Sequence, residues 1–172
     1  YLCNPNNPTG QLMDSDDLES FCSKISKTAT VFVDEAYHEY VMDPNYRSMI
    51  GLVKEGKNII VSRTASKVHG LAGLRVGFAI TTPEIAKRME SYLTDSLNIV
   101  GLRAAIASYQ DERFQAFSIE QNNRARKVVT DFLDEKGIQY LDSQSNFIFI
   151  KTGIQISDFQ PGMEKYGVIP QT

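Results

Sequence analysis

The sequence has little of what several classes of protein require. Its 172 residues include two cysteines, two histidines and no tryptophan. Cys3 and Cys22 have no spacing typical of metal ligands, and we expect no metal site. Two cysteines are also too few for a disulfide framework. This scarcity is typical of a reducing compartment, and we therefore expect a cytoplasmic protein.

An excess of positive charge is also missing. Lys and Arg number 18 against 21 Asp and Glu, so the net charge is −3. A chain without an excess of positive charge is poorly suited to bind a polyanion, and we therefore expect no nucleic acid partner. No apolar run approaches the roughly 18 residues of a membrane span, and the first residues do not resemble an export signal. We therefore expect no membrane partner.

What is present is the composition of a globular protein, with 42% hydrophobic and 23% charged residues. The near-continuous apolar runs are typical of strands buried on both faces of a largely parallel sheet. These runs are Thr30–Val33, Asn58–Ser62 and Val76–Ile80. Stretches with helical patterns accompany them at residues 14–25, 83–90 and 98–109. The alternation predicts an α/β fold with a mostly parallel sheet and flanking helices.

A second unit is expected from residue 111 onward. Residues 111–136 are strongly charged, with apolar residues at mostly helical spacing, and Gly137 stands where a helix is expected to end. Two further strands are predicted at 138–141 and 146–150, followed by a short amphipathic stretch at 156–166. We expect residues 1–110 to form part of a large α/β domain and residues 111–172 to begin a small α+β domain.

The loop that follows the first strand reads Asn-Pro-Asn-Asn-Pro-Thr-Gly at residues 4–10. Its two prolines stiffen the loop and would project Asn7 at the edge of the sheet. A plain connecting turn is the alternative interpretation.

Asp34 follows the apolar run 30–33. A buried carboxylate needs a cationic partner, and open α/β sheets bind ligands beyond the carboxyl ends of their strands. A helix cap is the alternative role for Asp34.

Hydroxyl groups, a lysine and an arginine follow the next apolar strand, in residues 62–67 and 70–75. Hydroxyls and a guanidinium suit a phosphate group. A lysine beside such a pocket can act as nucleophile and base. These residues do not follow the Gly-x-x-x-x-Gly-Lys-Ser/Thr order of a nucleotide P-loop, and the sequence has no Gly-x-Gly-x-x-Gly pattern. Binding sites for a nucleoside triphosphate or NAD are therefore disfavoured. The three stretches together indicate a ligand with a phosphate, a positive ring nitrogen and a group reactive toward lysine, which describes pyridoxal 5'-phosphate.

The motifs also resemble a known family. Asn-Pro-Asn-Asn-Pro-Thr-Gly at 4–10, Asp-Glu-Ala-Tyr at 34–37, Ser-Lys at 66–67 and Gly-Leu-Arg-Val-Gly at 73–77 occur in the order and spacing of the class I/II aminotransferases. These enzymes have the pyridoxal-phosphate-dependent transferase fold of type I. Within them the chain looks most like the histidinol-phosphate aminotransferases. The resemblance covers nearly the whole chain, and its motifs are far more specific for the superfamily than for the substrate.

The resemblance implies a role for each matching residue. Lys67 would bind the cofactor covalently and move the proton at the substrate Cα. Asp34 would pair with the pyridine nitrogen, and Asn7 and Tyr37 would bind the 3'-oxygen of the ring. The cofactor phosphate would be held by Thr64, Ser66 and Arg75.

Other polar residues have weaker assignments. His38 is interpreted as a hydrogen-bonded packing residue and His69 as a support of the lysine loop. Asn146 stands where related enzymes place an asparagine near the substrate, and its role stays open. Arg124 and Arg126 are expected to be solvated.

The resemblance implies an enzyme that transfers an amino group between a histidinol-phosphate-like donor and a 2-oxo acid, in histidine biosynthesis and as a homodimer. The same scaffold also serves other amino-acid aminotransferases, including aromatic ones, as well as decarboxylases and β-lyases. Family elements that lie outside these 172 residues include the arginine for the substrate carboxylate. We therefore expect a fragment of a longer enzyme, inactive by itself. A non-catalytic fragment is the remaining alternative.

Overall fold

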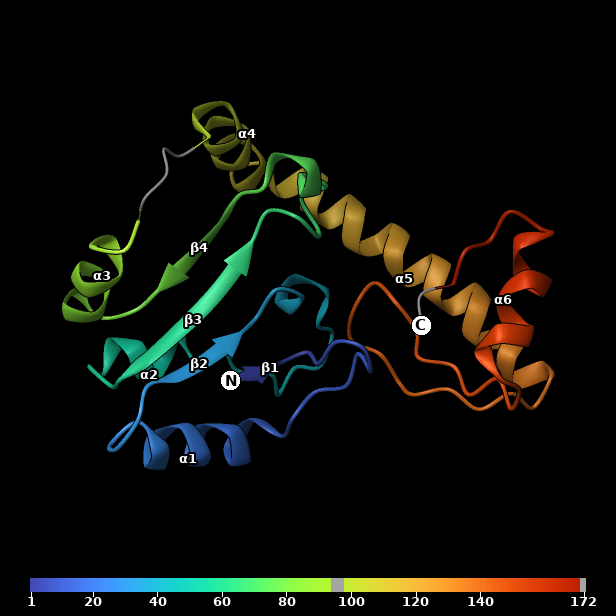
Figure 1. The fold of residues 1–172 in the computed structure, drawn as a ribbon, viewed down its shortest axis with the longest axis horizontal. Helices are drawn as coiled ribbons and strands as arrows, with labels where there is room; N and C mark the ends of the chain where they lie inside the picture. The colour runs from blue at the N-terminus through green and yellow to red at the C-terminus, as the bar shows by residue number, and fades with distance from the viewer. Residues whose placement is uncertain (94–97, 171–172) are drawn as a thin grey trace.

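The computed structural model describes residues 1–93 and 98–170 and contains a four-stranded sheet (Figure 1). The strands follow one another across the sheet in chain order. Their bounds are β1 Leu2–Cys3, β2 Val31–Asp34, β3 Ile59–Thr64 and β4 Gly77–Ile80. β1, β2 and β3 are parallel, whereas β4 runs antiparallel to β3. The expectation of an α/β fold with a mostly parallel sheet is confirmed.

Two helices supply much of the core under the sheet. α1 (Ser15–Ile25) begins at Asp14, whose carboxylate accepts the backbone N–H groups of Asp16 and Asp17. The apolar face of α1 packs against the sheet together with α2 (Ile50–Lys54). The buried residues of this cluster are Leu18, Cys22, Val31, Val33, Met49, Leu52, Val53, Ile59 and Val61. Burial of each large apolar side chain stabilises the fold by roughly 1.5 to 3 kcal/mol.

The remaining helices are η1 His38–Tyr40, η2 Ala72–Leu74, α3 Pro83–Glu90, α4 Ile99–Tyr109, α5 Glu112–Glu135 and α6 Ile156–Glu164. α3, α4 and α5 follow the expected bounds closely, whereas η1, η2 and α2 were not predicted from the sequence. The side chains of Asn98 and Asp111 accept backbone N–H groups at the starts of α4 and α5. Gly137 has a φ of +64° and ends α5. Its N–H donates to the backbone carbonyl of Asp134, and the N–H of Ile138 donates to the backbone carbonyl of Leu133.

The strand expectations for 138–141 and 146–150 are wrong. The two segments share an isolated antiparallel bridge between Tyr140 and Ile150 instead of extended pairing. Around the bridge the Leu141 N–H donates to the Phe149 carbonyl and the Lys151 N–H to the Gln139 carbonyl. Between the two segments the Gln144 N–H donates to the Gly10 carbonyl, so the connection is bound to a distant loop and the pairing stays limited to the one bridge.

One further expectation needs correction. The apolar run 76–80 was expected to form a strand buried on both faces, yet Gly77, Phe78 and Ala79 of β4 are exposed. Among the described strands β4 pairs with β3 alone, so it forms an edge of the sheet. The amphipathic stretch 156–166 forms a shorter helix, α6, which contains Pro161.

The long helix α5 connects the sheet to the last part of the chain (Figure 1). The segment after α5 returns toward the loop between β1 and α1, and its Phe147 packs, together with Ile119 of α5, on a second buried cluster of Tyr37, Tyr40 and Val68. None of the helices within the described residues is long and apolar enough to cross a membrane.

Candidate active site

The carboxyl ends of three strands meet at one edge of the sheet. The parallel register places Cys3 opposite Asp34, and Asp34 opposite Ser62. The Asn7 loop, Asp34 and the Lys67 loop therefore leave the sheet side by side. Open α/β sheets bind their ligands at this edge, and the sequence motifs converge there as expected.

Asp34 is held at the end of β2 by several hydrogen bonds. Its Oδ1 accepts from the Ser62 hydroxyl at 3.0 Å and from the Ala36 N–H at 3.1 Å, while Oδ2 accepts from the Tyr1 hydroxyl at 2.7 Å. The bond to Asp34 raises the pKa of Tyr1 to about 12, because it stabilises the neutral phenol. The partners that the structure gives Asp34 are hydroxyls and a backbone N–H, which fix the orientation of its carboxylate.

Asn7 and Tyr37 lie together although they follow different strands. The Asn7 Nδ2 donates to the Tyr37 hydroxyl at 3.0 Å. The Tyr37 ring is buried and packs edge-on against Phe147, with ring centroids 5.1 Å apart. The Asn7 amide and the Tyr37 phenol are therefore in hydrogen-bond contact at the carboxyl edge of the sheet.

Lys67 lies in the loop after β3, two residues beyond the buried Ala65. Its ammonium group stands over the Tyr37 ring, 4.8 Å from the ring centroid, which is the geometry of a cation–π contact. The loop is closed by backbone bonds from Leu71 N–H to Ala65 and from Gly70 N–H to Lys67, both 3.0 Å. The expected lysine therefore contacts the expected tyrosine.

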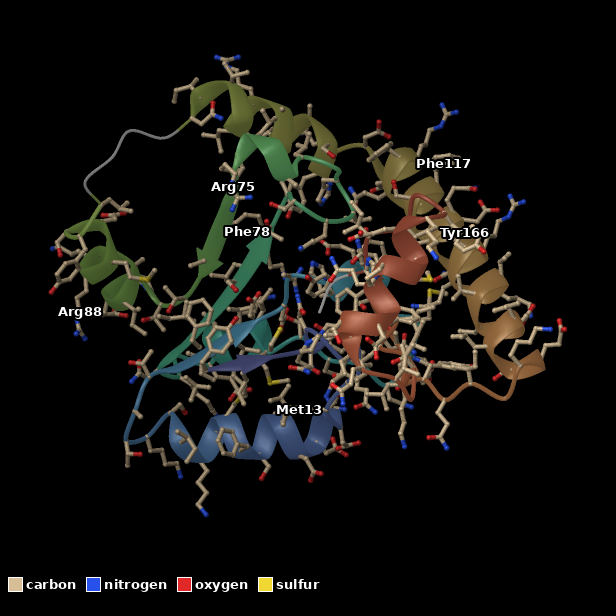
Figure 2. All side chains as sticks on the ribbon, turned by 45° about the vertical axis from the view of Figure 1, so that its right-hand side comes forward. Met13, Arg75, Phe78, Arg88, Phe117 and Tyr166 are labelled. Atoms are coloured by element: carbon tan, nitrogen blue, oxygen red, sulfur yellow. The ribbon has the colours of Figure 1, made fainter. Side chains whose placement is uncertain are left out.

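The three residues expected to hold a phosphate are brought together only in part. The Thr64 hydroxyl donates to the Ser66 hydroxyl at 2.9 Å and accepts the Ser66 N–H at 3.1 Å, so the two hydroxyls form a pair. Arg75 is exposed, and its guanidinium donates to the Ala72 carbonyl in its own turn. Figure 2 shows Arg75 where η2 meets β4. Arg75 also has a left-handed φ of +55°, which is unusual for a residue with a side chain.

A buried carboxylate that the sequence reasoning did not assign lies next to this edge. Glu35 is 1% exposed and accepts the Met49 N–H at 2.8 Å, the Ser48 hydroxyl at 2.7 Å and the Arg63 guanidinium at 2.8 Å. These contacts connect the ends of β2 and β3 with the turn before α2. The only sequence signal was an arginine directly after the apolar run 58–62, since a guanidinium close to the core needs an acidic partner.

The residues with weaker assignments fall into different places. His69 is buried and His38 half-buried, whereas Asn146 is exposed. The expectation that Arg124 and Arg126 are both solvated is wrong for Arg126. Arg126 is half-buried and donates to the Ser145 carbonyl at 3.1 Å, and burial lowers its pKa. Arg124 is exposed.

Comparisons with known proteins agree with this arrangement. The family model for aminotransferase class I and II matches residues 1–158. A histidinol-phosphate aminotransferase from Brevibacillus brevis is 36% identical over 173 residues, which cover 98% of this chain and 47% of the relative. The chain spans about half the length of the curated relatives it matches.

Solved structures show the same similarity. A crystal structure of a candidate histidinol-phosphate aminotransferase from Erwinia carotovora atroseptica has a TM-score of 0.94 at 36% identity, covering 98% of this chain and 49% of that one. A histidinol-phosphate aminotransferase from Sinorhizobium meliloti, in complex with pyridoxal-5'-phosphate, has a TM-score of 0.89 at 25% identity and covers 100% and 48%. With the family model matching most of its residues, this chain belongs to the class I and II aminotransferase family.

Proposed function

We propose that this chain carries cofactor-binding residues of a pyridoxal-phosphate-dependent aminotransferase. The enzyme would transfer an amino group between a histidinol-phosphate-like donor and a 2-oxo acid. One observation carries the proposal: the Lys67 ammonium lies 4.8 Å from the centroid of the Tyr37 ring, and the hydroxyl of the same ring accepts from Asn7. The names of the relatives from Brevibacillus brevis and Sinorhizobium meliloti support the choice of donor.

The groups at this edge fit the chemistry of pyridoxal 5'-phosphate. Asp34 offers a carboxylate for a protonated ring nitrogen, and Lys67 offers an amine for the aldehyde. The paired hydroxyls of Thr64 and Ser66 offer donors for the phosphate. When bound, the cofactor supplies an electron sink for the charge left when the substrate Cα loses its proton.

The residues of the chain have distinct tasks in this reaction. The Asp34 carboxylate is oriented by Ser62 and by the Ala36 N–H, so its negative charge can keep the ring nitrogen protonated. Asn7 and Tyr37 would hold the ring oxygen and thereby fix the orientation of the ring. The Lys67 amine would take the proton from the substrate Cα and deliver a proton to the aldehyde carbon of the cofactor.

Borohydride reduction of the full-length holoenzyme tests the proposal. Reduction should fix the cofactor on the peptide that contains Lys67, and Lys67→Ala should abolish both labelling and amino transfer from histidinol phosphate to 2-oxoglutarate. Lys57→Ala is the matched control, because Lys57 pairs with Glu55 away from this edge. Label on Lys57 or Lys87, or turnover by Lys67→Ala at the wild-type rate, would overturn the assignment.

We further infer that the full-length protein forms a cytoplasmic homodimer, in which residues 1–110 belong to a large domain and residues 111–172 to a small one. The family resemblance supports this organisation. Sedimentation of the active full-length enzyme should give the mass of a dimer. A monomeric mass for the active species would contradict the inference.

A further inference from the structure

His69 lies in the lysine loop, two residues after Lys67, and its imidazole side chain is fully buried. The sequence indicates only that it supports the lysine loop, and the proposed function does not use it. Buried polar side chains are costly unless they have partners. The contacts of His69 therefore show which parts of the fold its position depends on.

On one side the imidazole contacts α4. Its Nδ1 lies 2.9 Å from the Ser108 hydroxyl, a hydrogen bond in which either group can donate, depending on the tautomer. Its ring lies against the Tyr109 ring, with centroids 3.9 Å apart and an interplanar angle of 41°. The hydrogen bond from Ser108 and the ring contact from Tyr109 come from adjacent residues of α4. Together they hold the imidazole in both position and orientation.

On the other side the imidazole faces η1. Its Nε2 lies 3.6 Å from a carboxylate oxygen of Glu39, and the same oxygen lies 3.0 Å from His38 Nε2. η1 follows Tyr37 directly in the chain. His69 is therefore placed between α4 and the turn that carries Tyr37.

Lys67 and Tyr37 are thus each within two residues of this buried group of side chains. The Lys67 ammonium and the Tyr37 ring are also in contact. A displacement of His69 would move the lysine loop relative to Tyr37, since the loop is closed on itself by short backbone hydrogen bonds. We propose that His69 is a positioning residue that clamps the lysine loop between α4 and η1 and thereby sets where the Lys67 amine stands.

The proposal rests on the proposed role of Lys67, but the effect of His69 on the lysine loop can be measured without the cofactor. Hydrogen–deuterium exchange of the cofactor-free, full-length protein reports the opening of the loop 65–71. His69→Ala should speed exchange of the Leu71 and Gly70 amides about tenfold, and Ser108→Ala should have a smaller effect in the same direction. His69→Asn keeps a polar atom near the position of Nδ1 and should restore much of the protection.

Steady-state kinetics of the loaded enzyme form the second readout. Misplacement of the lysine should lower kcat about 10- to 100-fold with little change in KM, because the lysine acts in the transition state. His69→Asn should recover part of kcat. His38→Gln is the matched control, since it also alters a Glu39 contact but not the contacts with α4.

Several outcomes would overturn the proposal. Protection of the 65–71 amides and kcat could both stay at wild-type values in His69→Ala and Ser108→Ala. Exchange could also rise equally throughout the chain with kcat unchanged, which would mean that His69 serves general stability only. If the wild-type protein does not bind pyridoxal phosphate, the proposed function fails, whereas a loop that opens selectively in His69→Ala still supports the clamp.

Discussion

Gly10 lies directly against Ser143, far away in the chain. A Cβ on Gly10 would overlap the Ser143 hydroxyl and stand 2.7 Å from the Ser143 Cβ. The Gly10 carbonyl accepts the Gln144 N–H at 2.8 Å, and Gly10 has a left-handed φ of +73°. This close approach joins the loop that presents Asn7 to the segment that follows α5.

Gly10→Ala should therefore destabilise the protein markedly. A left-handed backbone costs a residue with a Cβ roughly 1 to 2 kcal/mol, and overpacking adds about 1 to 3 kcal/mol. Gly56→Ala is the matched control, because Gly56 has a similar φ of +78° but open space around it. Urea unfolding should show a distinctly larger loss of stability for Gly10→Ala than for Gly56→Ala. Equal losses would mean that the contact with Ser143 contributes nothing.

Arg63→Met should lower the free energy of unfolding strongly, because it leaves Glu35 buried without its cationic partner. Breaking such a pair costs about 3 to 5 kcal/mol. The double variant Arg63→Met/Glu35→Gln removes both charges and should recover a large part of this loss. The exposed pair of Lys127 and Asp131 provides the control, where Lys127→Met should change the unfolding free energy very little. Strictly additive effects of the two core substitutions would contradict the direct coupling.

Stability should decrease at mildly acidic pH because of His69. Burial lowers the pKa of its imidazole from 6.5, against the opposing effect of Glu39. The unfolded chain therefore takes up a proton near pH 6.5 that the folded chain binds only at lower pH. The stability due to neutral His69 is fully present above pH 6.5 and is lost as the pH falls through the folded pKa.

A pH series of urea unfolding curves measures this effect. The groups that face His69 are Glu39 and His38 from η1 and Tyr109 from α4, and burial raises the pKa of Tyr109 to about 12. Tyr109 is thus a neutral phenol throughout the acid range. His69→Gln should flatten the fall in stability below pH 6.5 relative to the wild type. An unchanged slope in His69→Gln would assign the acid sensitivity to other groups.

If Asp34 pairs with the ring nitrogen as proposed, Asp34→Asn should slow the loss of the substrate Cα proton while leaving the proposed covalent bond between Lys67 and the cofactor intact. The amide keeps the shape of the carboxylate but not the charge that favours a protonated ring nitrogen. A loss of ~4 kcal/mol from this step is about a thousandfold in rate. Exchange of the Cα proton with deuterated solvent, followed by NMR on the saturated full-length enzyme, measures the step.

Asp131→Asn, on the exposed surface of α5, is the control for this experiment and should leave the exchange rate unchanged. Asp34 would instead be a structural anchor if Asp34→Asn only weakened cofactor binding and exchanged the Cα proton at the normal rate once resaturated.

The sequence by itself determined most of the secondary structure of this protein. Helix bounds could be predicted because their signals are local: Asp14, Asn98 and Asp111 cap the helices that follow them, and Gly137 ends α5. The carboxyl-edge location of Asp34 and Lys67 could also be predicted, because parallel strands end at a common edge.

Only the tertiary structure decided which side chains meet. Glu35 and Arg63 are 28 residues apart, and His69 and Ser108 are 39 apart. Such partners are chosen by the packing of whole elements, which residue spacing does not encode. The strands expected at 138–141 and 146–150 are reduced to one bridge for a similar reason. The Gln144 N–H between them bonds to the Gly10 carbonyl, a partner remote in the sequence that no local pattern indicates.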